Sequence, residues 1–158
     1  PLLDLYGLAP QARWSGPTGA LPFGGADSDE RGFVRALGRV QLSDGNLYDK
    51  VLQMHPAWRP DGYVSSTFDV TIPASATRFS ARAGFLPGAS ASDGVTVSVI
   101  LGVQKIATRT LRPADGVGEI AAEIPETWRG QAVAVHLFVA ARATSTQDWF
   151  VWVAPAIH

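Results

Sequence analysis

Three segments between Gly62 and Leu101 constrain the fold more than any other part of the chain. Apolar residues occupy every second position over 64–72, 79–85 and 95–101, except for Ser66 in the first segment, with mostly Ser, Thr, Asp and Arg between them. A period of two is typical of β-strands that have one buried and one wetter face. The stretch therefore predicts three long antiparallel strands.

Further strands are predicted on both sides of this stretch. Residues 33–42 and 47–55 form a hairpin around the turn Ser43-Asp44-Gly45-Asn46. For the second strand, the sequence leaves two possibilities for the side chains that face the core: Tyr48, Leu52 and Met54, or Leu47 and Val51. Strands are also expected over 102–111, 117–124, 133–139 and 148–153. The last of these is apolar on both faces, which predicts cover on both sides.

The N-terminal thirty residues are rich in loops. Residues 1–8 predict a short amphipathic turn or an edge strand, 12–25 a structured loop with two very short strands, and 26–31 an acidic loop. Whether residues 1–30 belong to the sandwich or cap it stays open. No amphipathic helix of ten or more residues is evident. We therefore predict one all-β domain over 1–158, an antiparallel β-sandwich of the jelly-roll type, with 1–30 packed on it.

Composition excludes several classes of function. The net charge is −1 and the arginines are scattered, so we expect no nucleic-acid binding. The chain has no cysteine, which rules out disulfides and thiol chemistry. No apolar run approaches the roughly 18 residues of a membrane span, so we expect no membrane insertion. Because the chain starts at Pro1 without a methionine or a signal-like segment, it is either a mature secreted chain or a module cut from a longer protein, and we expect the latter.

Enzymatic motifs are missing from the sequence. There is no G-x-S-x-G elbow, no phosphate-binding loop and no complete dinucleotide fingerprint. The three histidines are not at metal-ligand spacing. Glycoside hydrolysis would need two carboxylates to converge from distant loops. We therefore expect a non-catalytic protein and keep hydrolysis as the weakest alternative.

The acidic segment Asp27-Ser28-Asp29-Glu30 has two interpretations. Asp27, Asp29 and Glu30 could supply oxygen ligands to a structural Ca²⁺ in a loop. The segment departs from an EF-hand loop, however, because Arg31 and Gly38 stand at ligand positions five and twelve. The alternative, which we favour, is a solvated acidic turn.

Loop aromatic residues give the best indication of a ligand. Sugar recognition uses flat aromatic faces together with a few fixed polar groups. Trp14, Trp58 and Trp128 fall in loop-like segments beside arginines, whereas Trp149 and Trp152 are predicted in the core. The main candidates for ligand contact lie in the segment 55–63 and are His55, Trp58, Arg59 and Tyr63. Three weaker candidates lie elsewhere, namely Trp14, Trp128 and Arg129. In the alternative interpretation Trp58 plugs one end of the sandwich.

The second half of the chain resembles a family of bacterial modules. The features that carry the resemblance are the strand 76–85, the loop ending at Asp93-Gly94, the strand 95–99 and the terminal segment 147–152. Over about residues 62–154 the chain resembles galactose-binding-like β-sandwich carbohydrate-binding modules, and is most similar to the NPCBM type appended to glycoside hydrolases. The resemblance implies sugar binding outside the cell without catalysis. It also implies a structural role for Asp148, which matches an acidic residue of the family's closing strand.

Two functions follow from these observations. The first is a carbohydrate-binding module of an extracellular or cell-surface bacterial protein, with Trp58 as the stacking face and His55 and Arg59 as donors to hydroxyl groups. The second is an assembly or adhesion module that packs against copies of itself or neighbouring domains. In that case Trp14 and Trp58 would be buried at a contact, and residues 2–6 could pair along a strand edge.

Overall fold

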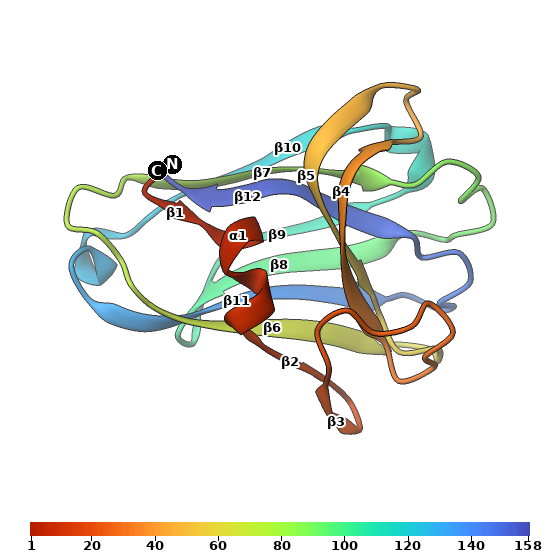
Figure 1. The fold of residues 1–158 in the computed structure, drawn as a ribbon, viewed down its shortest axis with the longest axis horizontal. Coiled ribbons are helices and arrows are strands. Elements are labelled where there is room, and N and C mark those ends of the chain that lie inside the picture. Colours follow the sequence, from red (N-terminus) through yellow and green to blue (C-terminus); the bar gives the residue numbers. More distant parts are fainter.

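The computed structural model describes residues 1–158 and contains two antiparallel sheets packed face to face (Figure 1). The first sheet has the strand order β10–β7–β12–β5–β4, with β1 paired to β12. The second has the order β3–β2–β6–β11–β8–β9. The first comprises β1 (Leu3–Asp4), β4 (Phe33–Gln41), β5 (Leu47–His55), β7 (Arg78–Phe85), β10 (Gly118–Glu123) and β12 (Phe150–Ile157). The second comprises β2 (Arg13–Gly16), β3 (Gly19–Leu21), β6 (Tyr63–Thr71), β8 (Val95–Leu101), β9 (Gln104–Leu111) and β11 (Ala132–Ala141). The predicted β-sandwich is confirmed.

The alternating segments form the facing walls of the core. The apolar sets of β7 and β8 are fully buried, and those of β6 are buried apart from the half-buried Val70. They belong to one cluster of 29 buried residues between the two sheets. Burial of this much apolar surface is the main force holding the two sheets together.

Strand β12 lies in the middle of the first sheet and is covered on both faces, as predicted. Phe150 and Trp152 face the main core. Val151 and Val153 pack on the opposite face with Leu42 and Val51. The strand continues past the predicted end at residue 153 to Ile157, with an irregularity between Val153 and Ala156.

The β4–β5 hairpin contains a β-bulge, and the structure shows which residues of β5 face the core. Pairing shifts around Gly38, and both Gly38 and Lys50 have positive φ angles. Beyond Lys50 every residue of β5 is buried, because Leu52 and Met54 face the main core while Val51 faces the outer cluster. A bulge bends a hairpin and increases its twist, and the hairpin rises away from the sandwich in Figure 1.

The N-terminal segment is part of the sandwich. Strand β1 pairs with β12, and the Leu2 N–H donates to the carbonyl of Ile157 at 2.8 Å, so the two chain ends lie side by side (Figure 1). One side of β1 is therefore used inside the chain, and the predicted edge pairing of residues 2–6 with another copy stays a prediction. Helix α1 (Leu5–Leu8) and the 3₁₀ helix Ala9–Gln11 follow.

The remaining helices are two short 3₁₀ turns, Pro113–Asp115 and Glu126–Trp128. None of the helices is long and apolar enough to cross a membrane.

Candidate functional site

A cleft of about 420 Å³ lies on the outer face of the first sheet, where β4 and β5 meet the loops that precede β12 and follow β7. It is lined by two tryptophans, other apolar side chains and four polar ones: Trp58, Trp149, Phe33, Leu37, Leu86, Asp27, Arg35, Gln53 and His55. We call this set the aromatic cleft.

Strands β4 and β5 provide five of the lining residues because alternate residues of a strand share a face. Phe33 pairs with His55 and Arg35 with Gln53 across the two strands. The Phe33 and His55 rings stack with centroids 4.9 Å apart and planes 13° apart. The register of one hairpin therefore places an aromatic pair beside a polar pair.

The two tryptophans come from different loops. Trp58 is 43% exposed, and its backbone N–H donates to the carbonyl of Glu30 at 2.9 Å. Its ring centroid is 6.2 Å from that of His55. Trp149 is half-buried just before β12, and its carbonyl accepts from the N–H of Leu86 at 3.0 Å. Both loops are thus fixed to neighbouring backbone rather than free.

Polar groups of the cleft are arranged around a single ion pair. Arg35 Nη1 lies 3.5 Å from Asp27 Oδ2, and both side chains are well exposed. Gln53 is almost completely buried in the sheet beside them. The cleft thus offers guanidinium and amide donors together with carboxylate and amide acceptors, the groups that bind hydroxyls.

His55 is held as a neutral imidazole. It is only 4% exposed, and burial lowers its pKa below the ordinary value of 6.5. Its Nδ1 lies 2.8 Å from the carbonyl oxygen of Pro56. Because a carbonyl only accepts, Nδ1 carries the proton and Nε2 is left as an acceptor. The expected role of His55 as a donor therefore becomes that of an acceptor.

The other candidates of segment 55–63 do not line the cleft. Arg59 is exposed outside it. Tyr63 starts β6 in the second sheet and stacks on Phe138 with centroids 5.2 Å apart. The structure brings together His55 and Trp58 from this segment and separates the other two.

The three weaker candidates have structural contacts elsewhere. Trp14 lies in β2 rather than in a loop, is 3% exposed, and donates from Nε1 to the carbonyl of Ala9 at 3.0 Å. Its ring belongs to the main core and also lines a depression of about 460 Å³ with Arg13 and Phe23, apart from the aromatic cleft, so its role as a ligand contact stays a prediction. Trp128 and Arg129 lie near residue 71 of β6, at the other end of that strand from Trp58. Trp128 donates to Gln104 and Arg129 donates to the carbonyl of Ile124.

The acidic segment forms a turn. Arg31 binds Asp29 through two hydrogen bonds of 3.0 and 2.7 Å and holds the pKa of Asp29 below its ordinary value. Asp27 instead faces Arg35. No group of three histidine or acidic side chains gathers where one ion could bind. Asp27, Asp29 and Glu30 therefore do not converge on one position, and both interpretations of the segment stay predictions.

The residues missed by sequence reasoning are Phe33, Arg35, Gln53 and Trp149. Gln53 carries a signal, since one amide interrupts the apolar run from Val51 to Met54. Arg35 has no such sequence signal, apart from its place on the polar side of the predicted strand. Trp149 was predicted in the core because it continues the alternation of the closing strand in the sequence, yet β12 begins one residue later.

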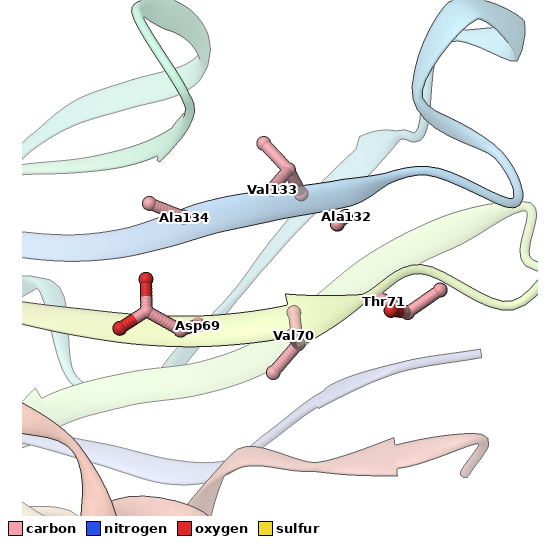
Figure 2. A pocket seen from close by; sticks show the side chains of 6 residues that line it. All are labelled: Asp69, Val70, Thr71, Ala132, Val133 and Ala134. Carbon is pink, nitrogen blue, oxygen red and sulfur yellow. The ribbon is translucent and has the colours of Figure 1, made fainter.

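A second depression, of about 450 Å³, lies between β6 and β11. Figure 2 shows its six lining side chains, with Asp69 as the only charged one and no aromatic ring among them. Arg13 binds Asp69 at 2.8 Å. Lacking a ring face or several free polar groups, this depression offers little to a sugar.

No family model matches the sequence. No curated protein matches it either. Solved structures do match its fold. A CBM51 module from Clostridium perfringens GH95, solved in complex with methyl-galactose, superposes with a TM-score of 0.60 at 13% identity, covering 87% of this chain and 95% of that module.

Two further structures are similar. The CBM51-2 and INT domains of Clostridium perfringens ZmpB give a TM-score of 0.58 at 12% identity over 97% of this chain, which spans only 30% of that chain. CBM27-1 of Caldicellulosiruptor saccharolyticus, solved with mannohexaose, gives 0.54 at 10% identity over 78% of this chain and 80% of that one. At such identities the comparison establishes the fold. The resemblance to β-sandwich carbohydrate-binding modules is confirmed at that level, and the NPCBM type stays a prediction.

Proposed function

We propose that the chain is a non-catalytic carbohydrate-binding module and that the aromatic cleft is its binding site. The observation that carries the proposal is the pair of tryptophans lining one cleft with Arg35, Gln53 and His55. A pyranose has apolar faces that stack on indole rings and hydroxyls that need fixed donors and acceptors. Trp58 would supply the exposed stacking face, and Trp149 a second apolar surface.

The charge of the cleft favours a neutral sugar. Its one carboxylate, Asp27, faces its one guanidinium, Arg35, so neither charge is left over for an ionic ligand. His55 is neutral and adds none. We therefore propose a neutral hexose unit as the ligand class.

A binding role fits the cleft better than hydrolysis. Most glycoside hydrolases place two carboxyl groups on either side of the scissile bond. Asp27 is the single carboxylate among the lining residues. We also propose an extracellular or cell-surface location, where glycans and polysaccharides are accessible, and an NPCBM-type module as the family.

The assembly or adhesion function remains a second hypothesis without a specific observation in its favour. Trp14 is buried within the chain itself, and β1 pairs with β12. Of the two tryptophans expected at such a contact, only Trp58 is exposed.

A glycan-array screen of the wild type beside Trp58→Ala tests the proposal. We expect the wild type to bind a set of neutral glycans and the variant to lose most of that binding. Removing a stacking ring of this size costs about 1–3 kcal/mol, which is roughly a fivefold to 150-fold loss of affinity.

Trp128→Ala is the matched control, since it removes the same side chain outside the aromatic cleft. We expect it to keep the wild-type binding pattern once thermal unfolding shows that both variants are folded. Equal losses in the two variants, or no wild-type binding to any glycan, would reject the cleft as the site.

A further inference from the structure

A separate depression, of about 290 Å³, lies on the outer face of the first sheet, where β7 and β12 run side by side. Its polar lining comprises Ser80 and Arg82 from β7, Glu119 from β10 and His158. It shares no residue with the aromatic cleft, and no tryptophan, tyrosine or phenylalanine lines it. Any ligand here must therefore be recognised by polar groups rather than by stacking. We call this set the arginine depression.

The backbone of β12 departs from regular pairing at this depression. The register shifts between Val153 and Ala156, and Ala154 and Pro155 between them have no partner in β5 or β7. Ala154, which lines the depression, has a φ angle of 48°. This is the left-handed region, which is unfavourable for a residue that carries a Cβ. Bulges and strained backbone of this kind gather at functional sites, which favours a role here beyond strand pairing.

Arg82 is exposed and is oriented by a ring from the β4–β5 hairpin. Its Cζ lies 5.9 Å from the centroid of the Tyr48 ring, which is within reach of a cation–π interaction. The hydroxyl of Tyr48 donates to Asp44 Oδ2 at 2.5 Å and fixes the ring from its far end. Because the ring attracts the guanidinium through its face, the N–H groups at the edge of the guanidinium stay free to bind a ligand.

Positive side chains outnumber negative ones around the depression. Glu119 is its only carboxylate side chain, and Arg78 Nη2 already lies 2.9 Å from Glu119 Oε1. Arg109 Nη1 donates to the backbone carbonyl of Glu119 at 2.6 Å. Arg82 lies opposite Glu119 in the register and forms no ion pair in the chain. Even with Asp44 counted, these side chains leave one positive charge without a partner.

We propose that the arginine depression binds one anionic group, a carboxylate or a sulfate, and that an acidic sugar is the ligand that carries it. The planar guanidinium of Arg82 would bind two oxygens of the group side by side, as guanidinium groups do with carboxylates and phosphates. Ser80 lies two residues away on the same face of β7 and adds a hydroxyl donor. Anion binding here does not depend on the aromatic cleft, whereas the choice of a sugar as carrier rests on the proposed function.

The test is an NMR titration of the whole chain with sodium glucuronate and with glucose 6-sulfate, at an ionic strength held constant with NaCl. It follows the side-chain Nε–H signal of Arg82 and the backbone N–H signal of Ala154. We expect both signals to move along one saturable curve with at least one of the two sugars, which identifies the group, and to stay in place with neutral glucose. Arg82→Gln should abolish the movement of the Ala154 signal. Arg13→Gln, which removes an arginine paired with Asp69 in the second sheet, should keep it.

Several outcomes would overturn the proposal. They are no saturable movement of the Ala154 signal with either sugar, an equal movement with neutral glucose, or equal losses in Arg82→Gln and Arg13→Gln, which would indicate general screening of charge. Sodium sulfate and sodium acetate form a further arm, and saturable binding of these ions without binding of the two sugars would reject an acidic sugar as the carrier. Trp58→Ala should leave the Ala154 response unchanged, so a failure of this site and a failure of the aromatic cleft are distinguishable.

Discussion

At the scale of single residues, the chemistry of the cleft depends on groups whose state is fixed by burial. His55 is the clearest case, since Pro56 determines its tautomer and burial favours its neutral form. The neutral ring accepts a hydrogen bond at Nε2, and a protonated ring could not. The acid–base state of one side chain therefore decides what the cleft can recognise.

This leads to a pH prediction for binding and stability. The pKa of His55 in the folded protein lies below 6.5, so folding favours the neutral ring. Its contribution to stability is complete above pH 6.5 and is lost as the pH falls, because the unfolded chain then binds the proton more readily. We expect glycan affinity to be constant above pH 6.5 and to weaken as the pH falls through the lowered pKa of His55.

Calorimetric titration at a series of pH values measures this dependence. His55→Gln keeps an acceptor and removes the titration, so its affinity should change little with pH. A variant that retains the wild-type pH profile would show that another group is responsible.

At the scale of elements, the loop between β5 and β6 controls where Trp58 lies. Gly62 closes this loop, since its N–H donates to Arg59 and its carbonyl accepts from Ala141. A Cβ at Gly62 would overlap the carbonyl oxygen of Ala57. Only glycine fits the present backbone, so the loop has one shape that presents the indole.

We therefore expect Gly62→Ala to displace the loop. The free energy of unfolding should fall by about 1–3 kcal/mol, and glycan affinity should fall as Trp58 moves. Gly118→Ala is the control, because a Cβ there meets nothing closer than 4.0 Å and φ is not in the left-handed region. Denaturant unfolding and calorimetry measure both quantities. Wild-type affinity in Gly62→Ala would show that the position of Trp58 does not matter for binding.

The same scale explains what the sequence could predict. In β6 and in most of β7, buried residues alternate with more exposed ones, so the existence and facing of these strands follow from local pattern. The bulge at Lys50 could not be predicted, because it depends on how Gly38 pairs across the hairpin. The bulge shifts the register of the hairpin. It thereby changes which side chains face away from the core, and these include Gln53 and His55.

At the scale of the whole molecule, the cleft is a product of topology. Residues 27 and 149 lie more than a hundred positions apart and meet because β12 runs beside β5 in the first sheet. Sequence pattern identified Trp58 and His55, which are close in the chain. It missed Arg35 and Trp149, whose proximity depends on strand order and not on spacing.

The most direct test of the central claim is a ¹H–¹⁵N NMR titration that follows the indole N–H signals of the five tryptophans as neutral monosaccharides are added. Each signal is assigned by a single Trp→Phe substitution. We predict that the signals of Trp58 and Trp149 move with a common saturation curve, whereas those of Trp14, Trp128 and Trp152 stay in place. Movement of the Trp128 signal without that of Trp58, or no movement with any sugar, would contradict carbohydrate binding in the aromatic cleft.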